Sequence, residues 1–389
     1  MNGAGFKSMR SRALGLGIAG LALSGAGGLF DPPQFFRSYL VAFLFWIGLP
    51  LGCWAILMLH HLVGGRWGFM IQRALESALR TIPLMALLFV AVVFGLRELY
   101  PWAVPGAAET DPLLHEKSAY LNTPFFIARA IFYFAVWSVF GYLLHRWSLK
   151  QDRTGDASLT ERLQNLSGPG LVLFGLTVTF SAIDWVMSLE PHWYSTIYGM
   201  MFMVNNALAA LSFAIVVAYF LKDREPLSQV AGPDRFHDLG NLLLALVMLW
   251  AYLGFSQFLI VWAENLREEI PWYLKRITGG WRAVAVLLVA FQFALPFVLL
   301  LSRSTKRRVE VLSGVALLIL VMHWVDLLWL IVPAFHPGGF HLHWLDFAAL
   351  FGVGGLWVAA FLYYLGENSL LPLRDPRFVE VIGQAEGVR

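Results

Sequence analysis

The stretch Val311–Val332, VLSGVALLILVMHWVDLLWLIV, is long and apolar enough to cross a membrane, yet it carries His323 and Asp326. An ionisable side chain inside a bilayer costs several kcal/mol by most estimates and usually faces a protein-lined or water-filled interior. The two residues are three apart, so a helix places them on one face. This pattern indicates a protonatable site buried in a polytopic membrane protein.

Composition places the whole chain in the same class. Of its residues 58% are hydrophobic and 14% are charged, whereas ordinary soluble domains are about 25% charged. A span needs roughly 20 apolar residues. The sequence contains about ten such segments, near 13–29, 35–59, 80–99, 123–146, 168–189, 196–221, 239–262, 281–302, 311–332 and 343–365.

The first segment is the weakest, because it is short and Gly-rich. Lys7, Arg10 and Arg12 precede it and small residues lie near its end. These features also fit a cleaved signal peptide. That interpretation is an alternative to a retained first helix, and it would leave the orientation of the other nine segments unchanged.

The distribution of positive charge predicts the orientation. Lys and Arg accumulate in cytoplasmic loops, and a cytoplasmic N-terminus puts most of the 28 Lys and Arg residues inside. The cluster Arg303, Lys306, Arg307 and Arg308 marks the loop between spans 8 and 9 as cytoplasmic. We therefore expect both termini in the cytoplasm, and we attribute the net charge of +3 to topology rather than to nucleic-acid binding.

Several classes of site are excluded by the sequence. The single cysteine, Cys53, rules out a disulfide framework, a Cys-ligated iron–sulfur cluster and a C-x-x-C-H haem attachment in this chain. No P-loop or Rossmann glycine fingerprint is present. Residues 1–389 are therefore predicted to form one integral membrane domain.

The spans show a weak internal repeat. Spans 2–5 and spans 6–9 would cross the membrane in the same sequence of directions, so we predict an all-α fold of two parallel four-helix bundles with two flanking helices. The alternative is a coincidence between Trp- and Pro-rich helix ends. The predicted parts are a flanking helix (1–34), the first bundle (35–192), the second bundle (193–333), and the last helix with a cytoplasmic tail (334–389).

Ionisable residues recur at corresponding places in the two bundles. Asp184 and Asp326 each precede a proline by seven residues, and His192 follows the first of these prolines. Arg129 and Arg282 lie near the outer ends of the preceding spans. Functional sites of repeated membrane proteins commonly occupy such corresponding positions.

Two interpretations of these residues remain open. An unpaired charge at this depth is costly, so each Asp should be paired or protonated. Arg129 with Asp184 is either a proton-handling site or a structural ion pair. His323 beside Asp326 suits proton transfer near neutral pH, with Arg282 as a tuning residue, although a structural role is the alternative.

Further candidates lie near the two ends of the spans. His60, His61, Glu76 and His145 gather near the cytoplasmic end and are candidates for proton entry, or are simply solvated. Glu264 extends a polar track at the outer end of span 7. We predict no metal site, because the spacing in the outer segment His336–Asp346 matches no standard site. We also predict no haem in this chain, because only His323 is clearly at depth.

Three stretches carry a family resemblance. They are SAIDWVMSLEPHWYSTIYG (Ser181–Gly199), FSQFLIVW (Phe255–Trp262) with the following Asn-Leu, Glu-Glu and Trp-Tyr pairs, and FFIAR (Phe125–Arg129). The chain resembles the second large membrane subunit, ActF, of bacterial alternative complex III, a family similar to the NrfD/PsrC group of quinol-interacting membrane anchors. Glu264 and Arg267 depart from the expected pattern.

The resemblance implies a subunit of a quinol:cytochrome c (or equivalent acceptor) oxidoreductase in the electron-transport chain of the bacterial inner membrane. It implies quinol as substrate, with quinone or menaquinone bound non-covalently, and contact with lipid. Implied partners are an ActC-like sister subunit of ten helices, an iron–sulfur/molybdopterin-like subunit and multihaem cytochrome c subunits, which would hold the haem and iron–sulfur clusters. The sister is the better candidate for the productive quinol site.

The sequence leaves three functional interpretations. The chain could contribute quinol-side proton handling or proton translocation, or it could be a non-catalytic scaffold for peripheral redox subunits. A proton-coupled secondary transporter is the third, although paired Gly/Pro-interrupted spans, which mark broken transporter helices, were not found in the sequence.

Overall fold

The structure is a computed structural model that describes residues 3–378, and within this range it consists of helices and connecting loops without strands. Nine of the described helices are long and apolar enough to cross a membrane, or ten if one bent pair counts as a span. The chain is therefore a polytopic all-α membrane protein of about ten spans, which confirms the predicted fold class.

The helices that form the spans follow the predicted segments, and most of them extend beyond those segments. They are α1 (Gly3–Phe30), α2 (Pro32–Val63), α3 (Arg66–Leu79), α4 (Ile82–Phe94), α8 (Thr123–Thr154), α9 (Ser158–Trp185), α10 (Tyr198–Leu221), α11 (Pro233–Glu264), α13 (Trp281–Leu288), the π-helix η4 (Val289–Ala294), α14 (Leu295–Leu301), α16 (Val309–Phe335) and α17 (Trp344–Gly366). Consecutive helices α13, η4 and α14 together form one span. The short helices are α5 (Leu96–Leu99), α6 (Ala107–Thr110), α7 (Pro112–Glu116), α12 (Ile270–Ile277) and α15 (Arg303–Arg307).

Helix starts follow from local sequence. The side chain of Asp31 accepts a hydrogen bond from the backbone N–H of Gln34 at the start of α2, and Asn122 does the same for Phe125 at the start of α8. Both helices have proline in their first turn. A helix leaves the backbone N–H groups of its first turn without partners inside the helix. A capping side chain accepts a hydrogen bond from one of them, and a proline in the first turn has no N–H that needs a partner.

The third span differs from its prediction of 80–99. It consists of α3 and α4, which meet at a bend of 42°. Pro83 lacks the N–H that would bond to the carbonyl of Leu79, so one helical hydrogen bond is missing at the bend. The helical segment begins at Arg66, more than three turns before the predicted start.

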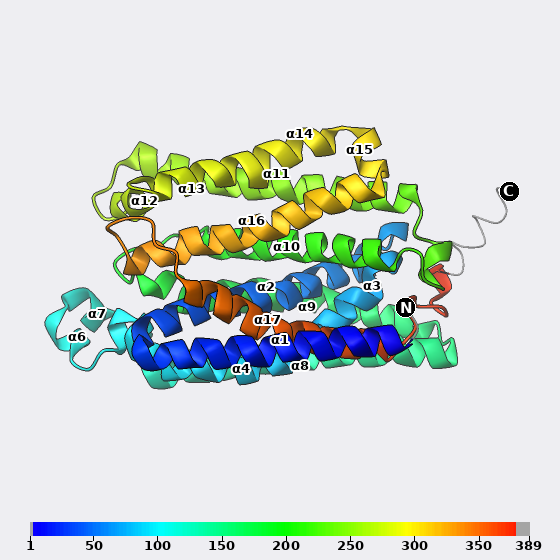
Figure 1. Cartoon of the computed structure of the whole chain (residues 1–389), viewed down its shortest axis with the longest axis horizontal. Helices are drawn as coiled ribbons and strands as arrows, with labels where there is room; N and C mark the ends of the chain where they lie inside the picture. Colours follow the sequence, from blue (N-terminus) through cyan, green and yellow to red (C-terminus); the bar gives the residue numbers. More distant parts are fainter. Residues whose placement is uncertain (1–2, 379–389) are drawn as a thin grey trace.

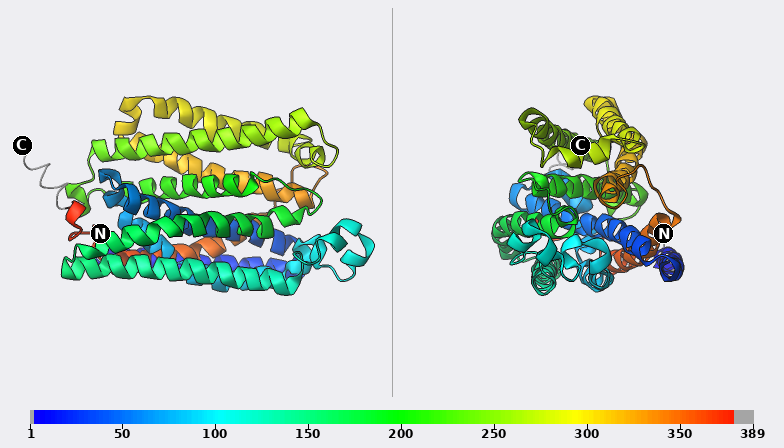
Figure 2. Two further views of the ribbon diagram at one scale, coloured as in Figure 1. Left: turned by 180° about the vertical axis from the view of Figure 1, so that it is seen from behind. Right: turned by 90° about the vertical axis from the view of Figure 1, so that its left-hand side faces the viewer.

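The helices gather into two sets of four spans with two flanking helices. Helices α2, α3–α4, α8 and α9 pack together, as do α10, α11, α13–α14 and α16, and the two sets also pack closely on each other, mainly through α10 against α2 and α9. Figures 1 and 2 show the spans running side by side along the long axis, with α11 to α16 on one side. Residue 3 and residue 378 lie at the same end, which also carries α15.

The first helix is held mainly by α17. It lies along α17, and α17 in turn packs on α2. Glycines make this close approach possible, because a Cβ at Gly355 would lie 2.4 Å from the Cα of Gly17, and one at Gly20 would lie 2.7 Å from the Cα of Gly352. Small residues let membrane helices pack backbone to backbone. Whether the first segment is removed as a signal peptide stays untested.

Replacing Gly355 with valine should force α1 and α17 apart. Overpacking of this kind costs about 1–3 kcal/mol, so the thermal unfolding temperature in mild detergent should fall. The matched control is Gly25→Val, because a Cβ at Gly25 meets nothing within 4 Å. Equal unfolding temperatures for the two variants would contradict the close packing described here.

Candidate functional site

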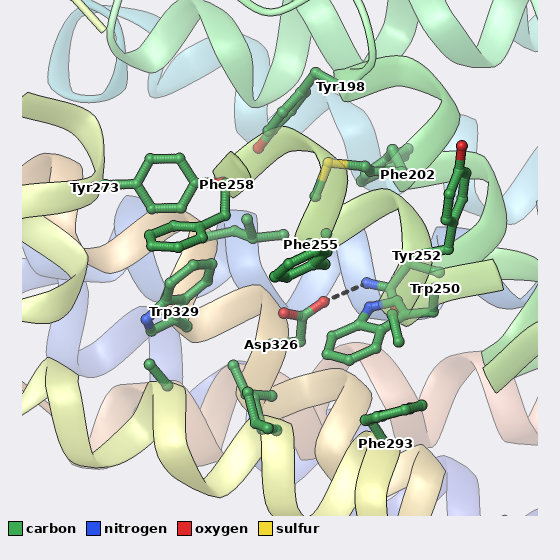
Figure 3. A pocket seen from close by; sticks show the side chains of 18 of the residues that line it. Tyr198, Phe202, Trp250, Tyr252, Phe255, Phe258, Tyr273, Phe293, Asp326 and Trp329 are labelled. Carbon is green, nitrogen blue, oxygen red and sulfur yellow. Dashed lines mark hydrogen bonds between the residues drawn. The ribbon is translucent and has the colours of Figure 1, made fainter. Parts of the chain in front are cut away.

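A large cavity lies in the second set of helices, toward the end that carries α12. Its volume is about 580 Å³, and Figure 3 shows aromatic side chains on several sides of it. The lining residues come from α10, α11, α12, α13 with η4, and α16. The aromatic ones are Tyr198, Phe202, Trp250, Tyr252, Phe255, Phe258, Trp272, Tyr273, Phe293 and Trp329.

Asp326 is the only acidic or basic side chain among the residues that line this cavity. It projects from α16 and is 5% exposed. Its Oδ2 atom accepts a hydrogen bond of 2.7 Å from Nδ2 of Asn205 on α10 (Figure 3), and the indole of Trp250 lies beside it. No ion pair found within residues 3–378 includes Asp326. The carboxyl group therefore has hydrogen-bond donors beside it and no arginine or lysine partner.

The π-helix η4 forms the part of the cavity wall nearest Asn205. Pro296 lacks the N–H that would bond to the carbonyl of Gln292, which accounts for the wider helical turn at this point. The buried side chain of Gln292 lies 3.3 Å from Oδ1 of Asn205. Short π-helical segments occur frequently at functional sites, and here the segment adds an amide to the polar group around Asp326.

The short helix α12 covers one end of the cavity with Trp272 and Tyr273. It is held by Arg276, which is 1% exposed and donates hydrogen bonds to Glu190 (2.7 Å) and to the backbone carbonyl of Leu330 (2.6 Å). Burial lowers the pKa of the Arg276 guanidinium, and Glu190 counteracts this effect. Arg276 thus ties α12 to α16 one turn beyond Asp326.

The sequence analysis did not single out Arg276. It named Arg282 as a residue that would tune His323 and Asp326, and the structure places Arg282 at the exposed start of α13, outside the residues that line the cavity. Arg276 follows Trp272 by four residues on a strongly amphipathic segment. That spacing is the signal that could have identified it.

His323 and Asp326 lie on the same helix but face different neighbours. The imidazole of His323 packs against the ring of Phe45 at 5.4 Å and faces Gly48 on α2, next to Asn206. It is buried, and neither ring nitrogen has a hydrogen-bond partner among the described residues. The two side chains do not form the adjacent pair that the sequence suggested, because Asp326 faces the cavity.

Arg129 and Asp184 form the ion pair that the sequence analysis expected. Arg129 donates from two nitrogens to the two carboxylate oxygens at 2.8 and 2.9 Å, and the Tyr133 hydroxyl donates to Asp184 at 2.8 Å. Arg129 also bonds to the backbone carbonyl of Tyr120, whose ring it covers. Both charged groups are buried and fully engaged, which favours the structural interpretation of this pair.

Two outer candidates lie away from the cavity. His192 is exposed and pairs with Asp111 at 2.8 Å in the loops beyond the first set. Glu264 is exposed at the end of α11. Neither side chain contributes to the cavity around Asp326.

The cytoplasmic candidates lie at the opposite end and are buried rather than solvated. Glu76 pairs with Arg73, accepts a hydrogen bond of 2.7 Å from Ser148 and lies 3.5 Å from His145. The neighbouring rings of His60 and His61 on α2 are also buried. The backbone carbonyl of His61 accepts a hydrogen bond from Arg377 of the C-terminal segment. The solvated interpretation is therefore wrong for this cluster.

The outer histidines surround the start of α17. The rings of His336 and His341 stack at 4.1 Å, and burial lowers the pKa of His336. Asp346 accepts hydrogen bonds from the backbone N–H of His343 and from Ser38, so it caps α17. Within the described chain, no group of three or more His, Cys, Asp or Glu side chains is arranged to hold a metal ion.

Comparison with known proteins adds no identification. No model of a known protein family matches the sequence, and no curated protein matches it. Functional conclusions for this chain therefore depend on the geometry of its own residues.

The Arg129–Asp184 pair provides a direct test of its structural role. Removing either partner alone leaves the other charge buried without compensation, which typically costs 3–5 kcal/mol, that is about half the stability of many domains. Arg129→Met and Asp184→Leu should each destabilise the protein strongly in detergent unfolding. The double variant should recover much of the loss, because no buried charge remains.

The matched control for this cycle is the exposed pair Lys222–Glu310. Glu310→Gln should leave the unfolding midpoint unchanged, since solvent screens exposed pairs. Additive losses in the Arg129 and Asp184 double variant would contradict the pairing.

Proposed function

We propose that this chain is a membrane subunit of a quinol-oxidising electron-transfer complex, and that the Asp326 cavity is its quinol site. The observation that carries the proposal is a buried carboxyl group, without a cation partner, in an otherwise apolar and aromatic cavity of about 580 Å³. Ligand cavities of this size with a few convergent polar groups are the usual form of small-molecule sites.

The route into the cavity suits a lipid-soluble substrate. Lining residues Tyr252 and Phe255 on α11 and Val289 on η4 have large exposed fractions, between 59% and 65%. These side chains lie on spans and would face the hydrocarbon of the membrane. A quinol could therefore enter sideways from the bilayer while its ring stacks against the aromatic walls.

The polar group around Asp326 suits the chemistry of quinol oxidation. A quinol that becomes a quinone gives up two electrons and two protons. In its ionised form Asp326 would accept the proton of one ring hydroxyl as a general base, with Asn205 holding the carboxylate in place, and the proton of the other hydroxyl would pass to water. The electrons would pass to the iron–sulfur and haem groups of partner subunits, which serve as the oxidant.

The orientation follows from the positive-inside rule. Arg303, Lys306 and Arg307 lie at the end of the bundle opposite α12. We infer that this end is cytoplasmic, so both termini are inside and the cavity lies in the outer half of a bacterial inner membrane. Protons from quinol would then leave toward the outside.

A scaffold function is the second candidate, and one observation favours it. In the first set, the aspartate that corresponds to Asp326 is bound by Arg129 and Tyr133, an arrangement that suits a residue that locks helices together. If Asp326 also has only a structural role, this chain anchors peripheral redox subunits and an ActC-like sister oxidises the quinol.

Replacing Asp326 with asparagine should separate these two functions. Asn is nearly the same size but cannot accept the proton, and general bases contribute about 10²–10⁴-fold. Quinol-dependent turnover and proton release of the purified complex should fall by about a hundredfold or more, with assembly intact. Glu264→Gln, at an exposed position outside the cavity, should behave as wild type. Wild-type turnover in Asp326→Asn would assign catalysis to the sister subunit.

Purification through a tag on this chain tests the assembly itself. In mild detergent we expect c-type haem, visible in the absorption spectrum, together with iron–sulfur and sister membrane subunits. A colourless protein that purifies alone, under conditions that preserve other respiratory complexes, would refute the redox assignment. It would instead support a proton-coupled secondary transporter.

A further inference from the structure

The cavity has a further polar group that faces it, the hydroxyl of Tyr198. Tyr198 is the first residue of α10, is 3% exposed and lines the cavity. Figure 3 shows its hydroxyl pointing into the space bordered by Phe255, Phe258 and Asp326. The sequence analysis did not single out this residue.

Tyr198 and Asn205 are seven residues apart on α10, so they lie on one face of the helix. Both line the cavity, as do Met201 and Phe202 between them. A separation of seven residues corresponds to about 10.5 Å along a helix axis. Along α10 the cavity wall therefore has a polar group at Asn205, beside Asp326, and another at Tyr198, with the apolar side chains of Met201 and Phe202 between them.

Two hydrogen-bonding groups two turns apart along α10 suit a ring with oxygens in para positions. Such oxygens lie on opposite sides of the ring, so each can reach a different group of the cavity wall. A phenol or a simple lipid alcohol has one oxygen and could reach only one of these groups. The presence of hydrogen-bonding groups at two places in the cavity thus distinguishes these classes of ligand.

Tyr198 is held in place by its surroundings. Its ring packs edge-to-face against Trp193 at 5.5 Å, and Trp193 stacks on Trp272 of α12 at 4.5 Å. Tyr198 is also within electrostatic range of Arg276, Glu190 and Asp326. A side chain fixed in this way needs little reorganisation to bind a ligand, so its hydrogen bond contributes more of its strength to affinity.

We propose that Tyr198 is the second anchor of the cavity, and that Tyr198 with Asp326 selects a para-dihydroxy aromatic ring over lipids with a single hydroxyl. This inference rests on the proposed quinol site. It goes further by naming the ligand class that the site distinguishes and the residue that makes the distinction.

The test compares two ligands that differ by one oxygen. They are an alkyl-1,4-naphthoquinol kept reduced with dithionite and the alkyl-1-naphthol with the same tail. Binding to the full chain in mild detergent is measured by calorimetry for wild type, Tyr198→Phe and Asp326→Asn. The matched control is Tyr363→Phe, which removes a tyrosine hydroxyl from α17, away from the cavity.

Wild type should bind the quinol about three- to tenfold more tightly than the naphthol, the value of one hydrogen bond. Tyr198→Phe should lose this preference by weakening the quinol alone, and its unchanged naphthol affinity would show that it folds. Tyr363→Phe should match wild type.

Each alternative result has a distinct meaning. Equal affinities of wild type for the two ligands, or an unchanged preference in Tyr198→Phe, would overturn the role of Tyr198 while leaving the quinol site standing. Binding of neither ligand by wild type, or binding that Asp326→Asn does not weaken, would overturn the quinol site and this inference with it.

Discussion

Polar side chains within the spans must find partners in the protein, because the hydrocarbon of a membrane offers none. Most of the buried charged groups among the described residues have an oppositely charged partner. Arg129 with Asp184 and Arg276 with Glu190 join segments that are distant in sequence, and Arg73 pairs with Glu76 on its own helix and with Asp152 on α8. Against that background Asp326 stands out, since its carboxyl group has amide and indole neighbours and borders an open cavity.

The two sets of helices give corresponding aspartates different surroundings. In the first set, Arg129 occupies the space beside Asp184, and the rings of Phe89 and Phe134 pack on Trp185 next to it. In the second set no arginine of α13 lies beside Asp326. The side chains of α12 instead cover one end of the cavity next to it. The same architecture therefore yields a closed structural pair in one half and a ligand-sized cavity in the other.

The sequence predicted the spans well because the length and apolarity of a membrane helix are strong signals. It also predicted the Arg129–Asp184 pair, since the two residues lie near the same ends of neighbouring helices in one set. It failed where the orientation of a side chain depends on neighbouring helices. His323 and Asp326 lie on roughly the same face of α16, but the His323 side chain packs against α2 and the Asp326 side chain faces the cavity. Arg276 was missed because it lies on a short helix outside the spans.

The depth of the polar groups bears on the direction of proton movement. Gly48, which faces His323 and Asn206, is twelve residues from His60 on α2, about 18 Å along the helix. Leu51, Trp54 and Leu57 are fully buried apolar side chains in this interval. A single hydrogen bond spans about 3 Å, so Asp326 and the Glu76 cluster cannot exchange a proton directly. In the proposed orientation the shorter route from Asp326 leads past Tyr198 to the outer face, which is where quinol oxidation would release its protons.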